Sequence, residues 1–402
     1  MPDKMVEEEP SKLVLPVRSS FSWKPSLYPP GELHIWSTSL SETFSFGTKP
    51  NQIDDLKTST NPPEVLIILI PGNPGLVEFY DEFLNNLYEN LSSKNISNQI
   101  VCVGHLGHSL NQSNSDLRYL KNFNLFSEQD GYANLKDQIR YHQDFVERIG
   151  GLVDLEKTKV VLIGHSVGAH IAAKVLEKHP KIVHHLYGLF PTLSQIGSTG
   201  NGKSMSPMFW PISLPILHCV QLLLSLILPR GILLSLVNLI TLIGKPKSER
   251  IALSINNLNT ATQLVINSNT VAAALIMARW EMKEILEIDE RFIKTYRQKI
   301  SLYWTEEGKD LWVNEEEIVK LQNLLDSSLN DEKKQIGIDQ DEGNVEGTEG
   351  RALPRVGLLG GQRWERSTVS EGIPHGFCLE YNEIMAEKCA SWIENLLKVS
   401  TT

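Results

Sequence analysis

Short apolar runs alternate with helical patterns along most of the chain. Residues 65–70 have the sequence Val-Leu-Ile-Ile-Leu-Ile, which is typical of a strand that helices cover on both faces. The repeated order of strand and helix predicts an α/β fold with a mainly parallel sheet and right-handed crossovers. Further strands are expected at residues 99–104, 159–163, 186–191 and 300–304 and near residues 368–369. Helices are expected at residues 135–149, 261–288 and 381–398, and Glu281, Lys283, Glu284 and Glu287 in the second of them are expected to be exposed.

Other segments depart from this alternation. Residues 32–37 and 42–46 predict two antiparallel strands joined by a polar turn. Residues 327–356 are acidic, rich in glycine and nearly free of aromatic residues, which predicts a disordered insertion. We therefore divide the chain into a polar tail (1–30), three parts of one core (31–205, 245–326 and 357–402), an apolar segment (206–244) and the acidic insertion (327–356).

The apolar segment 206–244 contains Arg230 as its only charged residue, and Pro229-Arg230-Gly231 divides it into two halves. Each half is near or below the roughly 20 residues that a membrane-spanning helix needs. Three interpretations remain open: one transmembrane helix from 212 to 228, a buried cap over the active site, or a hairpin that enters one leaflet. Soluble monomers rarely expose so much contiguous apolar surface. We therefore favour contact with a membrane or another lipid surface.

Charge and cysteine content narrow the function. A net charge of −10 argues against nucleic-acid binding, which usually requires a basic surface. The four cysteines have no paired spacing, so neither a disulfide framework nor a zinc site is expected. His105 and His108 follow a predicted strand without metal-ligand spacing and are expected to bond to the loop backbone. Neither end of the sequence predicts a signal peptide or a lipidation signal.

The most informative motif is Gly-x-Ser-x-Gly at residues 164–168, between an apolar strand and an Ala-rich helix. In this context the motif predicts a nucleophile elbow, a sharp turn that exposes Ser166 at the carboxyl edge of the sheet. Gly164 and Gly168 are expected because larger side chains would collide within so tight a turn.

The loop at residues 71–75, Pro-Gly-Asn-Pro-Gly, follows the first core strand. In this fold class such a loop supplies one amide of the oxyanion hole, and the residue after the nucleophile supplies the other. The two prolines have no amide hydrogen, so Gly72, Asn73 or Gly75 must donate. We favour Asn73, together with Val167.

A catalytic serine needs a base and a carboxylate that orients the base, in the chain order serine, acid, histidine. His375 suits the base, because it lies on a loop after the last expected strand and before the terminal helix. Asp310 follows the strand at 300–304 and is the favoured acid. The competing acids are Glu306, Glu307 and, less favourably because it lies beside the predicted disordered insertion, Asp326.

Taken together, several motifs resemble the lipid droplet-associated hydrolase family. They are residues 70–75 with Phe79-Tyr80 and Phe83-Leu84, residues 164–168, Asp310-Leu311-Trp312 and residues 373–377. The likeness extends from about residue 65 to 397, interrupted by the acidic insertion. The resemblance implies an α/β-hydrolase fold, helices on both faces of the sheet, and an apolar segment that targets lipid droplets and the endoplasmic reticulum. It also implies a triad of Ser166, Asp310 and His375.

We therefore predict a serine hydrolase for carboxylic esters of neutral lipids, either sterol esters or acylglycerols. Residues 206–244 would hold it on a lipid droplet monolayer or on the cytosolic face of the endoplasmic reticulum. No cofactor or metal is expected. The alternatives are a droplet-surface protein that binds or remodels lipid with weak or no catalysis, and a soluble esterase for small esters whose segment 206–244 is a buried cap.

Overall fold

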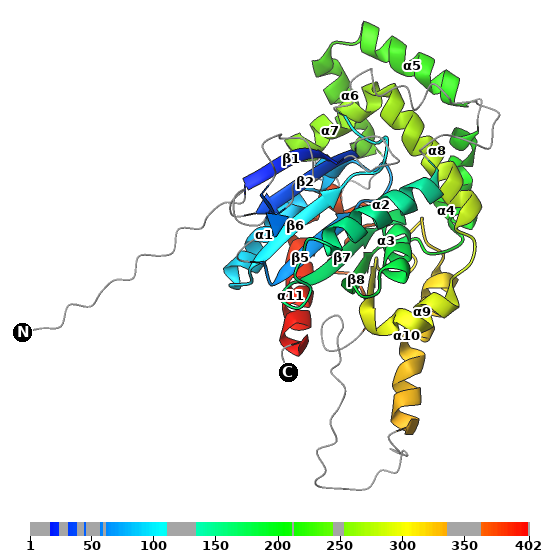
Figure 1. Cartoon of the computed structure of the whole chain (residues 1–402). Coiled ribbons are helices and arrows are strands. Elements are labelled where there is room, and N and C mark those ends of the chain that lie inside the picture. The colour runs from blue at the N-terminus through cyan, green and yellow to red at the C-terminus, as the bar shows by residue number, and fades with distance from the viewer. Residues whose placement is uncertain are drawn as a thin grey trace, which may run out of the picture.

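The computed structural model describes residues 17–23, 31–37, 44–45, 57–58, 62–110, 134–210, 213–243, 253–335 and 363–400. An eight-stranded sheet lies at the centre, in the order β1-β2-β6-β5-β7-β8-β9-β10 (Figure 1). The strands from β6 to β10 in this order are parallel, and β1 and β2 are antiparallel to their neighbours. The strands of this sheet are β1 (Val17–Trp23), β2 (Gly31–Ser37), β5 (Val65–Ile70), β6 (Asn98–Val103), β7 (Lys159–His165), β8 (Val183–Leu189), β9 (Ile300–Trp304) and β10 (Trp364–Arg366).

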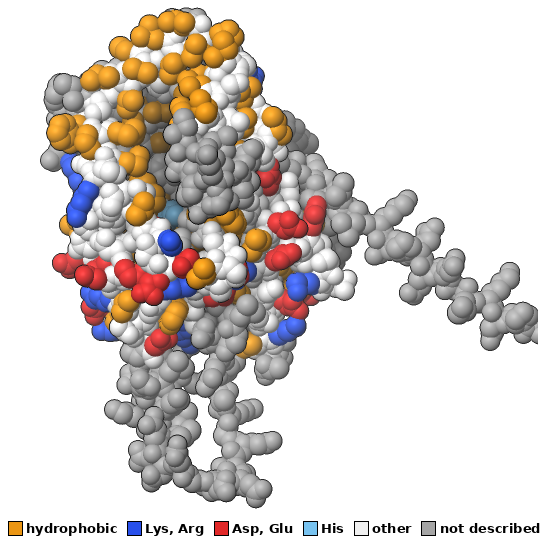
Figure 2. Space-filling model, turned by 180° about the vertical axis from the view of Figure 1, so that it is seen from behind, with side chains coloured by type: hydrophobic (Ala, Val, Ile, Leu, Met, Phe, Trp, Pro, Cys, Tyr) orange, Lys and Arg blue, Asp and Glu red, His pale blue; other side chains and the backbone are white. Residues whose placement is uncertain are grey.

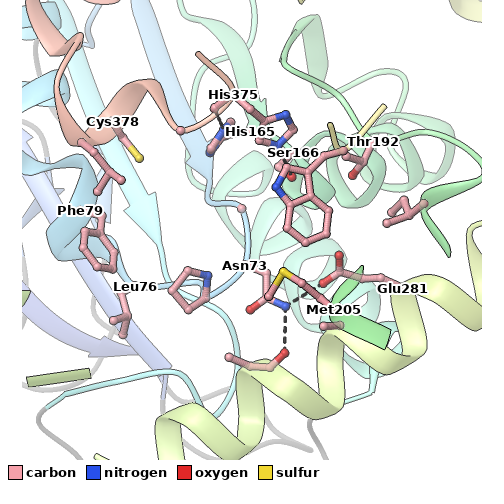
Figure 3. A pocket seen from close by; sticks show the side chains of 18 of the residues that line it. Asn73, Leu76, Phe79, His165, Ser166, Thr192, Met205, Glu281, His375 and Cys378 are labelled. Carbon is pink, nitrogen blue, oxygen red and sulfur yellow. Dashed lines mark hydrogen bonds between the residues drawn. The ribbon is translucent and has the colours of Figure 1, made fainter. Parts of the chain in front are cut away.

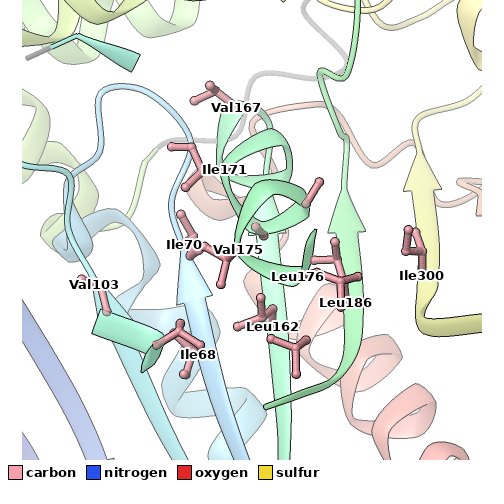
Figure 4. Close-up of a cluster of buried hydrophobic side chains, with 14 of the residues drawn as sticks. Ile68, Ile70, Val103, Leu162, Val167, Ile171, Val175, Leu176, Leu186 and Ile300 are labelled. Carbon is pink, nitrogen blue, oxygen red and sulfur yellow. The ribbon is translucent and has the colours of Figure 1, made fainter. Parts of the chain in front are cut away.

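Helices cover both faces of the sheet, as the unbroken apolar strand predicts. On one face lie α2 (Leu135–Gly150), α3 (Val167–Lys178), α9 (Glu290–Tyr296) and α10 (Glu315–Gln335); on the other lie α1 (Asp81–Ser93) and α11 (Asn382–Ser400). Strand β5 divides its side chains between the two resulting cores. Leu66, Ile68 and Ile70 enter the core under α2 and α3 (Figure 4), and the three intervening residues enter the core under α1 and α11.

A group of helices between β8 and α9 forms a cap beside the main body of the fold (Figure 1). These helices are α4 (Gly200–Met205), α5 (Ser213–Ile227), α6 (Arg230–Ile243), α7 (Ile255–Ile266) and α8 (Ser268–Glu284). Helices α7 and α8 contact the 3₁₀ turns η2 (Val77–Tyr80), η5 (Ile196–Ser198) and η6 (Ser206–Phe209), while α5 and α6 pack on α7 and α8. Among the described helices none is long and apolar enough to cross a membrane alone, although the bent pair α7 and α8 passes by length and composition.

The expected pairing of residues 32–37 with 42–46 is wrong. Strand β2 pairs instead with β1 and β6, and a short strand β3 (Phe44–Ser45) pairs with β4 (Lys57–Thr58) in a separate sheet. Both Ile35 and Trp36 of β2 are buried, which requires cover on both faces. Residues 1–30, which we expected to be a tail, contain strand β1. This strand is ordered by its pairing with β2.

Three other boundaries differ from prediction. The helix expected at 261–288 is two helices that meet at 87°, because the Asn267 side chain accepts the Thr270 amide and starts α8 afresh. The last strand is β10, a few residues before 368–369. Residues 327–335 of the expected insertion belong to α10, which its acidic first turn favours; residues 336–356 lie outside the described part of the chain.

Candidate active site

Ser166 lies at the sharp turn between β7 and α3. Its φ of +53° is in the left-handed region that non-glycine residues rarely adopt. Gly164 and Gly168 flank this turn, and neither position has room for a side chain. A Cβ atom on Gly164 would lie 2.5 Å from Ala169 Cα, and one on Gly168 would lie 2.2 Å from the Ile70 carbonyl oxygen. The turn therefore presents Ser166 at the carboxyl edge of the sheet, as the motif predicts.

The three candidate triad residues lie in hydrogen-bond contact. His375 Nε2 is 2.9 Å from Ser166 Oγ, and His375 Nδ1 is 2.9 Å from Asp310 Oδ2. The Asp310 carboxylate is 97% buried and also accepts the Trp312 amide at 2.9 Å. Nδ1–H therefore donates to Asp310, and Nε2 is the acceptor that faces the serine hydroxyl. Of the competing acids, Asp326 accepts from the Trp364 indole instead.

The loop at 71–75 offers one free amide from its three candidates. The Gly72 amide donates to the Tyr80 hydroxyl at 2.8 Å, and the Gly75 amide donates to the Gly72 carbonyl at 2.7 Å. Asn73 is therefore the loop residue whose amide is available. Val167 begins α3, where the first amides have no partner within the helix. Asn73 and Val167 remain the proposed oxyanion donors.

A second hydrogen-bonded chain runs behind the triad. His165 Nε2–H donates to the backbone oxygen of His375 at 2.8 Å, so His165 Nδ1 accepts from the Tyr80 hydroxyl at 2.6 Å. Burial lowers the pKa of His165 to about 3, so its ring stays neutral at physiological pH. The chain from Gly72 through Tyr80 and His165 to His375 connects the loop at 71–75, the turn at Ser166 and the loop that bears His375.

A cavity of about 460 Å³ opens beside Ser166 (Figure 3). Its wall is mostly apolar, with side chains from the oxyanion loop, the 3₁₀ turn after it, the cap helices and the His375 loop. Glu281 of α8 reaches the same cavity and accepts a hydrogen bond from Asn73 Nδ2 at 3.0 Å. Its expected exposure is wrong, because the residue is 93% buried. Burial raises the pKa of Glu281 to about 7.

His105 and His108 lie behind the oxyanion loop. The His108 ring bonds to the Pro74 carbonyl at 2.6 Å, as expected for a loop histidine, whereas His105 lies against His142. Within the described ranges, no three His, Cys, Asp or Glu side chains are arranged to hold a metal ion. Burial lowers the pKa of His108 to about 4, so this ring is neutral.

The family model and the relatives that match this chain carry the same family name. A model of the family described as lipid-droplet associated hydrolase matches residues 63–344, more than half of the chain. The chain belongs to this family. The mouse lipid droplet-associated hydrolase is 26% identical, with coverage of 84% of this chain and 87% of the relative. The relative of that name from Dictyostelium discoideum is 24% identical, with coverage of 85% and 91%.

Solved structures show the α/β-hydrolase fold of this family member. A membrane phospholipase A described as a bacterial virulence factor is 11% identical with a TM-score of 0.51, and the match covers 96% of this chain and 87% of that chain. Haloalkane dehalogenase DbeA from Bradyrhizobium elkani is 10% identical with the same TM-score, covering 96% and 100%. At such identity the likeness concerns the fold alone.

Sequence reasoning did not assign a role in the site to four residues of this family member: Tyr80, His165, Thr192 and Glu281. For Glu281, the sequence contains a pattern that could have predicted its burial. Ala273, Met277 and Glu281 recur at four-residue spacing, and the first two are almost fully buried. A carboxylate on the apolar face of a helix indicates a functional or paired group, whereas the charged residues that follow Glu281 suggested solvent.

Proposed function

We propose that this family member hydrolyses carboxylic esters of neutral lipids, namely sterol esters or acylglycerols, with Ser166 as nucleophile. The observation that carries the proposal is the unbroken contact from Ser166 through His375 to buried Asp310 at the mouth of an apolar cavity. A serine hydroxyl becomes a useful nucleophile only when such a base and orienting acid are in place.

In the proposed reaction, Ser166 Oγ attacks the ester carbonyl while His375 Nε2 accepts the hydroxyl proton. Asp310 keeps Nδ1 protonated and stabilises the imidazolium that forms. The amides of Asn73 and Val167 donate to the oxyanion of the tetrahedral intermediate. His375 then protonates the departing alcohol, and a water molecule attacks the acyl-enzyme by the same route to release the acid and regenerate Ser166. No metal or cofactor takes part in these steps.

The cap supports a site of action on a lipid droplet monolayer or on the cytosolic face of the endoplasmic reticulum. Helix α5 presents an apolar stripe to the outside and polar Gln221 to the inside. This is the opposite of the usual arrangement on a water-soluble surface, where the apolar side of a helix faces the core. The Gln221 side chain is buried and donates to the Val265 carbonyl. The outward side chains of the stripe on α5, defined here as the cap stripe, are Ile216, Val220, Leu223 and Ile227, each 45–68% exposed.

Exposed apolar side chains of α6 continue this surface, and Figure 2 shows apolar side chains gathered over this end of the molecule. A patch of this extent is typical of a surface that contacts another apolar phase. Helices α7 and α8 of the same cap contribute to the cavity wall and contact α5, so the cap stripe and the cavity are joined through these two helices.

Covalent labelling tests the catalytic part of the proposal. A fluorophosphonate probe reacts only with an activated serine, so it should label the full chain but neither Ser166→Ala nor His375→Ala. Absence of labelling of the wild type, in detergent and on lipid alike, would refute catalysis and favour a lipid-binding protein.

Flotation with triolein droplets coated by phospholipid tests the surface part. Replacement of Leu223 and Ile227 by serine should move most of the protein from the floating layer to the aqueous fraction. The control is Val319→Ser, which changes an exposed apolar residue on α10 outside the cap. Unchanged flotation of the double variant would refute the role of the cap stripe. Probe labelling without flotation of the wild type would favour the small-ester esterase.

A further inference from the structure

The cavity beside Ser166 has two unlike sides. In Figure 3, Leu76, Phe79 and Cys378 lie on one side, Thr192 and Glu281 lie on the other, and Ser166 and Asn73 lie between them. The first side is apolar and buried in the core under α1 and α11. The second side also carries apolar side chains, such as Met205, but it differs from the first in containing two polar side chains that an apolar ligand would leave unsatisfied.

Glu281 has hydrogen-bonding capacity to spare. Oε1 accepts from Asn73 Nδ2, which leaves Oε2 without a hydrogen-bond partner in the described part of the chain. Nearby cations are engaged elsewhere, since Lys136 pairs with Glu284 and Lys283 lies over the Trp280 ring. The carboxyl group is 93% buried but borders the cavity, so Oε2 is available to bond to a ligand there.

Thr192 shows the same deficit. The residue is 98% buried and borders the cavity, and its hydroxyl oxygen is enclosed and has no hydrogen-bond partner among the described residues, so a small rotation of the side chain is needed for it to reach a ligand. Its backbone amide bonds to the Ser166 carbonyl at 3.3 Å, which fixes the residue beside the nucleophile. Two incompletely bonded polar groups therefore flank the position where the ester must lie.

We propose that Glu281 and Thr192 form a subsite for a free hydroxyl group on the alcohol part of the ester. The inference rests on the proposed ester hydrolysis and narrows its substrate class. The hydrophobic effect places a fatty acyl chain on the apolar side, so the alcohol lies toward Glu281 and Thr192. A partial acylglycerol supplies hydroxyls there, whereas a sterol ester supplies only hydrocarbon and leaves both groups unsatisfied.

The ionisation of Glu281 suits this task. Burial raises the pKa of its carboxyl to about 7, so both protonation states are present near neutral pH. The protonated acid can donate to a hydroxyl oxygen, and either form can accept from a hydroxyl hydrogen. Sites that bond a substrate hydroxyl discriminate against analogues without one, because the buried groups then stay unpaired.

The test compares 1-monooleoylglycerol with propyl oleate, which differ only by two hydroxyl groups, in the same mixed micelles. The measured quantity is the ratio of their kcat/KM values for the full chain. Glu281→Met and Thr192→Val should each lower this ratio roughly three- to tenfold, the effect of about one hydrogen bond. Glu281→Gln keeps an acceptor for Asn73 and polar atoms for the substrate, so it should restore most of the ratio.

Matched controls are Glu284→Gln, one turn further along α8, and Thr295→Val, whose exposed hydroxyl bonds within its own helix. Both should keep the wild-type ratio. If Glu281→Met lowers kcat/KM for both esters equally, Glu281 serves only to hold Asn73 and the subsite is refuted. An unchanged ratio in all variants refutes the subsite but leaves ester hydrolysis intact, while a wild type that cleaves neither ester refutes both.

Discussion

Replacing Tyr80 by phenylalanine would test the hydrogen-bonded chain behind the triad. The substitution removes one oxygen atom and leaves the aromatic packing against His165 and Phe377 in place. That oxygen accepts from the Gly72 amide at 2.8 Å and donates to His165 Nδ1 at 2.6 Å, and it also contacts the Cys378 thiol. Both partners are buried, so neither has ready access to bulk water after the substitution.

Each buried group left without a partner costs about 1–3 kcal/mol, so Tyr80→Phe should lower the free energy of unfolding by about 2–6 kcal/mol. That is a large part of the 5–15 kcal/mol typical of a folded domain. Tyr187→Phe is the matched control. The Tyr187 hydroxyl is equally buried but donates a single bond, to the Trp392 carbonyl at 3.0 Å. That carbonyl lies inside α11 and keeps its helical bond, so the loss should cost only about 1 kcal/mol.

The assay is urea unfolding followed by tryptophan fluorescence, with comparison of midpoints at equal slope. Fluorophosphonate labelling rates report the site, and only Tyr80→Phe should slow them, because His165 also holds the backbone of His375. Equal loss of stability in the two variants would refute the argument that Tyr80 satisfies two buried groups. Unchanged labelling by Tyr80→Phe would refute its role in positioning the base.

Three further predictions concern the acid, the elbow and pH. Asp310→Asn should lower kcat about 10³- to 10⁴-fold with an unchanged unfolding midpoint, because the base then lacks its orienting charge; a loss below tenfold would exclude Asp310 as the acid. Gly168→Ala should prevent folding or labelling, since its Cβ would lie 2.2 Å from a backbone oxygen, whereas Gly231→Ala in α6, with open space around it, should be neutral or stabilising; equal expression and labelling of both would contradict this. Stability should fall below pH 6.5, because burial lowers the pKa of several histidines to about 3 and the unfolded chain then binds protons that the native chain does not. Each contributes up to about 1.4 kcal/mol per pH unit, and urea midpoints that stay flat from pH 7 to 5 would disprove the linkage. These histidines are His142, His165 and His185.

Sequence patterns predicted those parts of the molecule that depend on neighbours along the chain. The apolar run at 65–70 requires cover on both faces, and the glycines around Ser166 require a tight turn. The buried strand, the turn at Ser166 and the order of serine, acid and histidine along the chain could therefore be predicted from the sequence. Asp310 needed more than local pattern, because several acids follow β9 and only the fold brings one to His375.

The remaining features depend on contacts between distant segments. Asn73 and Glu281 are 208 residues apart, and no local pattern indicates that a cap helix would meet the oxyanion loop. The pairing of β1 with β2 and the break at Asn267 likewise follow from packing and capping that compete with simple periodicity. Short polar side chains and edge strands are therefore where the predictions failed.

The position of His375 far downstream of Ser166 in the chain has a consequence for biosynthesis. Ser166 leaves the ribosome 209 residues before its base, which at about 5–20 residues per second is roughly 10–40 s. Throughout that interval the serine has no proton acceptor, and the loop that bears His375 arrives only just ahead of α11. Under the proposed mechanism, a nascent chain that lacks the loop bearing His375 can thus be near a lipid surface without cleaving it, and reactivity begins only after that loop has been made.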